Sequence, residues 1–255
     1  MLGAIAGDII GSVYEGRPIK DKAFPLFGPG ASFTDDSVLT VATADVLLYG
    51  GDYREAYKRY FRRHPHAGFG GNFALWAASD EREPYGSFGN GAAMRVSPVG
   101  WARTTLDEVL AEAQQSAQVT HNHPEGIKGA QATAAAVFLA RARQSKADIR
   151  AFIEERFEYD LGRSLDEIRP GYAFDVSCQG SVPESIIAFL EAEDFEDAVR
   201  NAVSLGGDSD TQACVAGAIA EACYGLPASV EREVLARLDA DLAEISRAFR
   251  AAYIP

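Results

Sequence analysis

The sequence predicts an all-α protein, a single compact multi-helix domain over residues 1–255 with a binuclear metal cleft. Apolar residues recur at spacings of three and four along most of the chain, which is typical of helices that bury one face. Alternation of period two, which would indicate strands, is almost absent. The cleft is predicted by two acidic patches that lie far apart in the sequence and each precede a helical run. No shift in composition marks a second domain.

The first apolar run, residues 3–11, contains glycines at helical spacing. Gly7 and Gly11 are about one turn apart, so they would leave a smooth face for close helix packing. Asp8 is the only charged residue in the run. A carboxylate in apolar surroundings tends to have a raised pKa and can serve as a general acid or base. Glu15 lies one turn beyond Gly11 and is interpreted in the same way, or as a solvated helix end.

The two acidic patches repeat one pattern, in which two carboxylates and a threonine hydroxyl come just before an apolar helix. They consist of Thr34, Asp35 and Asp36 ahead of residues 38–48, and of Asp208, Asp210 and Thr211 ahead of residues 213–224. Helix capping is one interpretation, because Ser, Thr and Asp are favoured N-caps and acidic residues suit the helix dipole. One side chain is enough for a cap, however, so capping does not explain why both patches double the carboxylate.

Metal binding explains the doubled carboxylates. If the fold brings the two patches together, four negative charges balance two divalent cations. Carboxylate and hydroxyl oxygens are the ligands that hard cations such as Mg²⁺ prefer, with waters in the remaining positions. The patches therefore predict a two-metal hydrolytic centre, with a pair of ordinary helix caps as the alternative.

Two further segments have residues suited to ligand binding. A glycine-rich loop over residues 86–91 leads into a predicted helix, and free N–H groups at such a position can bind phosphate. The loop matches neither the Walker motif nor the dinucleotide fingerprint. His121 and His123 precede an Ala-rich helix over residues 126–142. Zinc would need further His or Cys ligands at standard spacing, so His121 is interpreted as a hydrogen-bonding or substrate-facing residue.

The remaining predicted helices follow from caps and apolar stripes. Thr105–Glu108 has the pattern of a capping box, and Asp194 is a predicted N-cap. Gly225 is the expected end of the helix after the second acidic patch. Apolar residues from 235 to 249 predict a last helix of four turns. Residues 172–178 could be extended, but no sheet can be built from them.

Composition excludes several classes of protein. The formal net charge is -13, from 37 acidic residues against 24 Lys and Arg, so general nucleic-acid binding is not expected. No stretch reaches the roughly 18 apolar residues of a membrane helix, so no membrane association is expected. The N-terminal segment has no basic flank of the kind found in signal peptides, and three cysteines without a Cys-x-x-Cys pair fit a reducing compartment. The expected localisation is cytoplasmic.

Five motifs follow one another along the chain: Gly7-Asp8-x-x-Gly11-x-x-x-Glu15, Phe33-Thr34-Asp35-Asp36, Gly89-Asn90-Gly91-x-x-Met94-Arg95, Thr120-His121 and Gly206-Gly207-Asp208-Ser209-Asp210-Thr211. In this order they resemble the ADP-ribosylglycohydrolase family, which includes the dinitrogenase-reductase-activating glycohydrolase and the ADP-ribosyl-arginine and ADP-ribosyl-serine hydrolases. The resemblance covers about residues 1–227. Each motif alone is modest, but the ordered set is specific.

The resemblance implies an all-α fold with two Mg²⁺, or Mn²⁺, in a cleft. The implied metal ligands are Thr34, Asp35, Asp36, Asp208, Asp210 and Thr211. The implied catalytic residues are Asp36, Asp208 and Glu15, the last matching a mobile glutamate of the family. The implied substrate-binding residues are Gly86, Ser87, Phe88, Gly89, Asn90 and Gly91 around the diphosphate and ribose, together with His121. Residues 179–182 lie where the family often builds its adenosine pocket.

The implied function is a Mg²⁺-dependent hydrolase that releases ADP-ribose from a modified protein side chain, with arginine as the favoured side chain. Its partner would be an ADP-ribosylated protein or a small-molecule ADP-ribose conjugate. One alternative is a hydrolase of oxygen-linked ADP-ribose, such as ADP-ribosyl-serine or O-acetyl-ADP-ribose. Others are a catalytically silent ADP-ribose binder and a metal phosphatase or pyrophosphatase. The chain is short for the family. Residues 123–126 are not shared by all branches of the family, so the resemblance does not fix the preferred leaving group.

Overall fold

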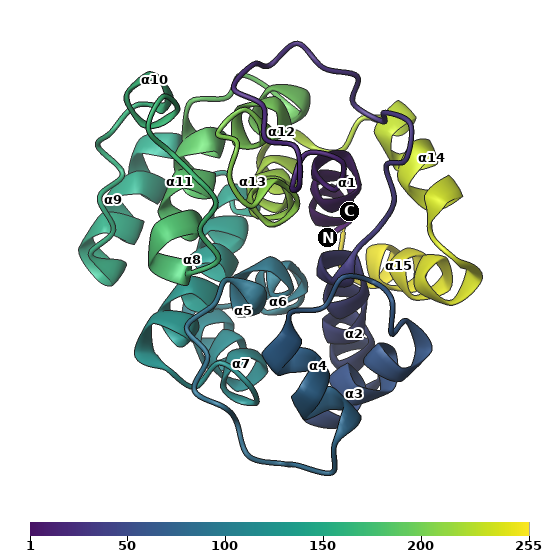
Figure 1. Ribbon diagram of the computed structural model, residues 1–255. Coiled ribbons are helices and arrows are strands. Elements are labelled where there is room, and N and C mark those ends of the chain that lie inside the picture. The colour runs from purple at the N-terminus through teal and green to yellow at the C-terminus, as the bar shows by residue number, and fades with distance from the viewer. Residues whose placement is uncertain (255) are drawn as a thin grey trace.

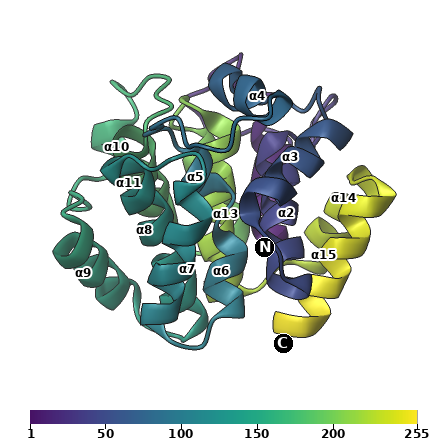
Figure 2. The ribbon, with the colours of Figure 1, turned by 90° about the horizontal axis from the view of Figure 1, so that it is seen from below.

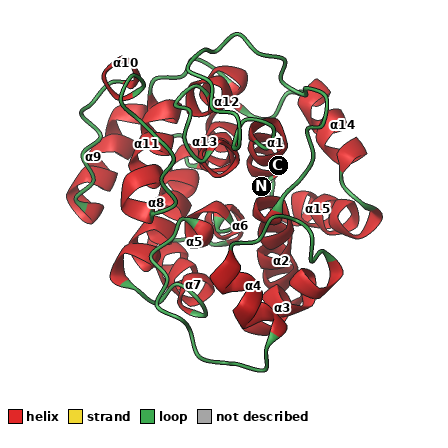
Figure 3. Cartoon of the chain, in the orientation of Figure 1, coloured by secondary structure: helices red, strands yellow, loops and turns green. Residues whose placement is uncertain are grey.

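A closely packed pair of helices, α1 (Leu2–Gly11) and α13 (Ser209–Tyr224), lies at the centre of the molecule (Figure 1). The computed structural model describes residues 1–254, and within that range it contains helices and no strands (Figure 3). The helices are α1 (Leu2–Gly11), α2 (Asp35–Tyr49), α3 (Tyr53–Arg63), α4 (Gly71–Ala78), α5 (Gly91–Met94), α6 (Ser97–Ala102), α7 (Leu106–Gln118), α8 (Pro124–Arg141), α9 (Lys146–Phe157), α10 (Leu165–Ile168), α11 (Cys178–Leu190), α12 (Phe195–Val203), α13 (Ser209–Tyr224), α14 (Ala228–Arg237) and α15 (Ala240–Tyr253). The predicted all-α fold of one compact domain is confirmed.

The contact between α1 and α13 depends on the glycines of α1. A side chain at Gly7 would put its Cβ atom 1.9 Å from the carbonyl oxygen of Ala213, so only glycine allows the two backbones to approach this closely. All ten residues of α1 are buried. The predicted smooth helix face is therefore a packing surface, and it brings Asp8 beside Asp210 at the start of α13.

The other helices surround this pair. On one side α13 packs against α8, α11 and α12, and α8 in turn packs against α5, α6 and α7. On the other side α2 packs against α3 and α15 (Figure 2). Several contacts hold the long connection between α1 and α2. Among them, Arg200 of α12 donates to the carbonyls of Lys22 and Phe24, and Arg237 of α14 lies over the ring of Phe27.

Most of the predicted helix ends are confirmed. Thr105 and Glu108 form a capping box at α7, Asp194 caps α12, and Gly225 ends α13. The predicted last helix of four turns was wrong. The chain instead breaks into α14 and α15, because the side chain of Asp239 accepts a hydrogen bond from Leu242 N (2.9 Å) and starts a new helix there.

The expected extended segment near residues 172–178 forms no sheet in the described structure. It makes a single antiparallel bridge, between Gly89 and Ser177. None of the helices in the described residues combines the length and the apolar character that a membrane crossing requires. The predicted domain of residues 1–255 includes Pro255, which lies outside the described residues, so its full extent stays a prediction.

The α1–α13 contact can be tested with two glycine substitutions. Gly7→Ala should lower the free energy of unfolding by about 2 kcal/mol or more, because the new methyl group forces two backbones apart. Gly16→Ala is the control, since no atom lies within 4 Å of a Cβ there, and its effect should stay within about 0.5 kcal/mol. Chemical denaturation of both variants measures the difference. Equal stabilities would show that the contact does not constrain the fold.

Candidate metal centre and cleft

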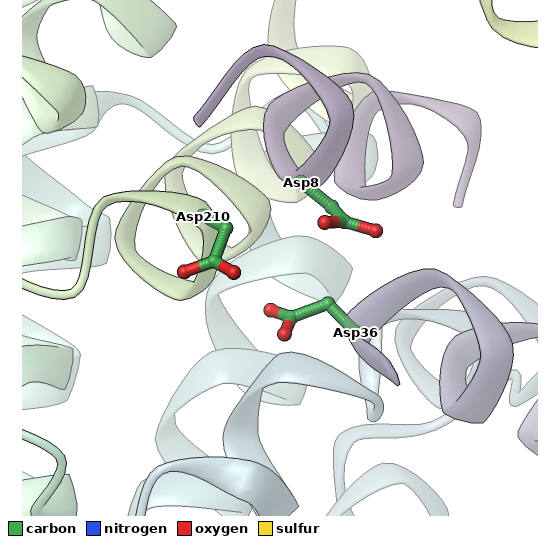
Figure 4. A group of neighbouring side chains, drawn as sticks. All are labelled: Asp8, Asp36 and Asp210. Atoms are coloured by element: carbon green, nitrogen blue, oxygen red, sulfur yellow. The ribbon is translucent and has the colours of Figure 1, made fainter. Parts of the chain in front are cut away.

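Carboxylates from three helices meet at one point near the centre of the molecule. Asp8 of α1, Asp36 of α2 and Asp210 of α13 point toward one another (Figure 4), and each offers an oxygen within 4.8 Å of the others. All three side chains are buried. A second group with the same spacing joins Asp208 and Asp210 to Glu15. The fold therefore brings the two acidic patches together, and Asp210 belongs to both groups.

Asp8 shares the capping of α2 with Thr34, the first residue of the first acidic patch. Its carboxylate accepts hydrogen bonds from Thr34 N (2.9 Å), Thr34 Oγ1 (2.7 Å) and Ser37 N (3.0 Å), and also from the Ser37 hydroxyl. The Thr34 side chain accepts from Asp36 N at 3.4 Å. The start of α2 is thus held by a residue of another helix, so Asp35 and Asp36 are not needed as caps.

The second patch is tied to the glycine-rich loop. Asn90 Nδ2 donates to Asp208 Oδ2 (2.7 Å), and the Asn90 backbone N–H donates to the Val176 carbonyl (2.7 Å). Asp208 is the N-cap residue of α13 but makes no side-chain capping bond. Thr211 Oγ1 donates to Asp36 Oδ2 (3.4 Å) and so links the second patch to the first. Simple capping therefore does not explain the carboxylate of Asp208 either.

Negative charge at the cluster is not balanced by the protein. Burial, followed by neighbouring carboxylates, raises the pKa of Asp36 and Asp210 well above the usual range. Burial and the charge of Asp8 raise the pKa of Asp35 to about 8, and burial raises that of Asp8 to about 6. Within residues 1–254, no Lys or Arg forms an ion pair with any of these carboxylates.

The donor set fits a hard divalent cation. Asp36 Oδ1 is buried and has no hydrogen-bond partner in the described structure, so one carboxylate oxygen is left without a partner at the centre of the cluster. The neighbouring atoms are carboxylate and hydroxyl oxygens, which suit Mg²⁺ or Mn²⁺ and not a soft metal. The acidic cluster could therefore bind metal, as predicted.

Asp36 and Asp210 of this cluster, together with Asp208, line a cleft of about 320 Å³. That volume lies within the range of small-molecule sites. All six predicted metal ligands line this cleft: Thr34, Asp35, Asp36, Asp208, Asp210 and Thr211. Asp35 is only half-buried and belongs to neither compact carboxylate group.

The cleft also receives most of the predicted substrate residues. Its walls include Ser87, Gly89, Asn90, Gly91 and His121. Burial, together with the nearby charge of Arg95, lowers the pKa of His121 well below its usual value, so this imidazole is neutral near pH 7.

The other predicted substrate residues lie outside the cleft lining. The Gly86 N–H donates to Asn122 Oδ1 (2.9 Å), and the half-exposed Phe88 packs edge-on against His123, with ring centroids 5.5 Å apart. Residues 179–182, suggested for the adenosine pocket, belong to α11 and do not line the cleft. Phe174 and Val176 line that side instead, and both are more than half exposed.

Glu15 lies in the turn that follows α1, at the mouth of the cleft. Its side chain is exposed, yet it approaches the carboxylates of Asp208 and Asp210. Partial burial of the carboxyl, followed by the charges of Asp208 and Asp8, raises the pKa of Glu15. Glu15 can therefore exchange protons at a higher pH than an ordinary glutamate.

Two parts of the site were not assigned from the sequence. Asp8 was interpreted as an acid or base, and its place in the carboxylate cluster was missed; the signal was a single carboxylate in an apolar helix. The cleft is also lined by residues at and just before the start of α4, to which no role was assigned from the sequence: Gly68, Gly70, Gly71, Asn72 and Phe73. The sequence Gly68-Phe69-Gly70-Gly71 was the available indication, because a glycine-rich loop lets a ligand approach the backbone.

Comparison with known proteins agrees with this geometry. Residues 1–253 match the family described as ADP-ribosylglycohydrolase. The chain belongs to the ADP-ribosylglycohydrolase family. The resemblance found in the motifs is confirmed, and with it the prediction of an ADP-ribosyl glycohydrolase enzyme.

Relatives of known name cover most of the chain. The ADP-ribosylhydrolase ARH3 of Bos taurus is 28% identical over 308 residues, which covers 89% of this chain and 84% of the relative. The ADP-ribosylarginine hydrolase Tri1 of Pseudomonas putida is 26% identical over 264 residues, covering 89% and 70% respectively. A solved structure described as an ADP-ribosylglycohydrolase-related protein complex superposes with a TM-score of 0.74 at 25% identity, over 97% of this chain and 94% of that chain.

The raised carboxyl pKa values predict how stability depends on pH. Asp8 and Asp35, with pKa values of about 6 and about 8, hold protons in the folded protein that an unfolded chain releases near pH 3.9. The metal-free protein should therefore lose stability as the pH rises from about 4 to about 8. Because a divalent cation offsets the repulsion, Mg²⁺ or Mn²⁺ should raise the melting temperature more at about pH 8 than at about pH 5.

Differential scanning fluorimetry measures this effect with EDTA-treated protein, with and without each cation. A melting temperature that is unaffected by either cation at about pH 8 would contradict the metal site. A metal-free protein whose stability rises over the same pH range would contradict the assigned directions of the pKa shifts.

Proposed function

We propose that this protein is a Mg²⁺-dependent hydrolase that cleaves the glycosidic bond between ADP-ribose and a modified protein side chain, releasing ADP-ribose. Two Mg²⁺, with Mn²⁺ as the alternative, would be held by Thr34, Asp35, Asp36, Asp208, Asp210 and Thr211. Arginine is the favoured modified side chain. Substrates would be an ADP-ribosylated protein or a small conjugate of ADP-ribose.

The meeting of two distant acidic patches in one cleft carries this proposal. Asp36 and Asp210 come from helices that begin about 170 residues apart in the chain, yet their carboxylate oxygens lie within 4.8 Å. Burying uncompensated carboxylates costs stability, so the arrangement is explained by a function that needs it. Membership of the ADP-ribosylglycohydrolase family supports ADP-ribose as the group released.

The residues of the cleft have separate roles in cleavage of the glycosidic bond. Cleavage of the bond at C1 of the ribose passes through an oxocarbenium-like state. When bound, divalent cations polarise ribose hydroxyls and activate water. Glu15 transfers a proton to the leaving group or from the water, which its raised pKa favours. Asn90 orients Asp208 through its amide, and Ser87, Asn90 and His121 hold the diphosphate and ribose.

Arginine is favoured by the charge at the mouth of the cleft. Glu15 and Asp35 are the carboxylates nearest to solvent there, and a guanidinium leaving group is cationic. The relative Tri1 is named as an ADP-ribosylarginine hydrolase, which agrees with this choice. Oxygen-linked ADP-ribose, as in ADP-ribosyl-serine or O-acetyl-ADP-ribose, is the second candidate, and a silent ADP-ribose binder the third.

The product formed distinguishes these possibilities. Full-length protein with Mg²⁺ should release intact ADP-ribose from an ADP-ribosyl-arginine peptide faster than from an ADP-ribosyl-serine peptide, as measured by chromatography. Faster release from the serine peptide would contradict the arginine preference. Phosphate or AMP as the product would show a phosphatase or pyrophosphatase, and no product with retained ADP-ribose binding would show a silent binder.

Substitution of Glu15 separates catalysis from binding. Glu15→Gln keeps the size of the side chain but removes its ability to transfer a proton, so turnover should fall by about 10²–10⁴-fold. Affinity for ADP-ribose, measured by calorimetry, should change far less because other residues hold that ligand. Turnover at the wild-type level would mean that Glu15 is only a solvated residue at the end of α1.

Asp210→Asn is the matched comparison at the same cluster. Asp210 belongs to both carboxylate groups, so loss of its charge should weaken binding of the metal and of ADP-ribose together. Calorimetric titration with Mn²⁺ and then with ADP-ribose measures both effects. A variant that binds metal as the wild type does and loses only turnover would contradict the assignment of Asp210 as a ligand.

A further inference from the structure

A buried chain of hydrogen bonds lies in the cleft wall, and the residues at both of its ends, Arg95 and His121, line the cleft. Arg95, which follows α5, is fully buried, and its guanidinium packs on the ring of Tyr57 at 4.2 Å. Arg95 Nη2 donates to the Ser116 carbonyl (3.1 Å) and to Thr120 Oγ1 (2.8 Å). Thr120 Oγ1 in turn lies 2.7 Å from His121 Nδ1. The chain of contacts therefore runs from a buried cation to an imidazole that lines the cleft.

The direction of these hydrogen bonds follows from the chemistry of the groups. A guanidinium can only donate, so Thr120 Oγ1 must accept from Arg95. The threonine hydroxyl keeps its single proton, which it can donate to His121 Nδ1 at 2.7 Å, and in that arrangement Nδ1 is the acceptor. A neutral imidazole carries one N–H, and with Nδ1 accepting, that proton lies on Nε2. The nearby Arg95 charge and burial both disfavour a doubly protonated ring.

We propose that Arg95 and Thr120 are positioning residues that fix His121 in the tautomer whose proton lies on Nε2, so that His121 donates a hydrogen bond into the cleft. Nε2 is the atom that faces the glycine-rich loop: a Cβ at Gly91 would lie 3.1 Å from it, and a Cβ at Gly89 would lie 3.7 Å from it. The loop therefore leaves Nε2 open toward the cleft.

The ligand class follows from this donor. The assignment of this ligand class rests on the proposed function, in which the diphosphate of ADP-ribose lies against the glycine-rich loop. Phosphate oxygens are acceptors only, so an imidazole that offered a lone pair at Nε2 would repel them, whereas an Nε2–H donates to them. Because the ring stays neutral, it adds no positive charge that would compete with a cation at the carboxylates.

The tautomer can be observed in the protein alone. Long-range ¹H–¹⁵N spectra of uniformly labelled full-length protein distinguish protonated from unprotonated ring nitrogens, and His121→Gln assigns the signals among the four histidines. We expect His121 to show a protonated Nε2 and an unprotonated Nδ1 near neutral pH. A protonated Nδ1, or a ring protonated at both nitrogens, would overturn the proposal. No ADP-ribose is needed, so this result is independent of the proposed function.

Variants at Thr120 test whether the hydroxyl positions the ring. Thr120→Val removes the hydroxyl and should weaken ADP-ribose binding by about three- to tenfold in calorimetry, while Thr120→Ser restores the hydroxyl and should bind as the wild type does. Thr133→Val is the control, because Thr133 is equally buried and its hydroxyl has no partner in the described structure. It should bind as the wild type does.

The outcomes separate the two proposals. Wild-type affinity in Thr120→Val, or equal losses in the Val and Ser variants, would overturn the positioning role. If Thr120→Val does not fold, the spectrum of the wild type still decides the tautomer. If the wild type shows the Nε2–H tautomer but does not bind ADP-ribose, the proposed function fails and the assignment of the tautomer stands.

Discussion

The close contact between α1 and α13 determines the rest of the site. Because Gly7 has no side chain, the backbone of α1 lies against the Ala213 carbonyl, and the main chains of the two helices are in direct contact. Asp8 is then carried to the start of α13, where Asp210 already lies. Two carboxylates that are some two hundred residues apart in the sequence thus meet in the interior.

Asp8 connects this contact to the remainder of the cluster. It accepts four hydrogen bonds from Thr34 and Ser37, and by doing so it holds the start of α2 against α1. An acidic residue of one helix therefore supplements the local cap, Thr34, of another. The consequence is chemical: the oxygens of Asp36 are released from capping, and one of them remains without a partner. The hydrogen bonds of Asp8 therefore have two effects: they stabilise the start of α2, and they leave the carboxylate of Asp36 available.

The walls of the cleft are built differently from its floor. The floor consists of the starts of α2 and α13, whereas the walls combine loops with residues of the short helices α4 and α5. Asn90 joins the glycine-rich loop to Asp208 through its side chain and to Val176 through its backbone. Arg95, which also lines the cleft, donates to Thr120, the residue before His121. Rigid helices thus set the positions of the charges, and the loops that contact a ligand are tied to those helices by single polar contacts.

The sequence by itself determined the helical class, most helix ends and the chemical nature of both acidic patches. Those features depend on the periodicity and on the neighbours of each residue, which are local properties. The tertiary structure alone decided that Asp8 joins the cluster, that Phe174 and Val176 replace residues 179–182 as cleft lining, and that residues at and just before the start of α4 line the cleft. It also divided the last helix at Asp239. Each of these features depends on which distant segments of the chain come into contact. The spacing of residue types along the sequence does not specify those contacts.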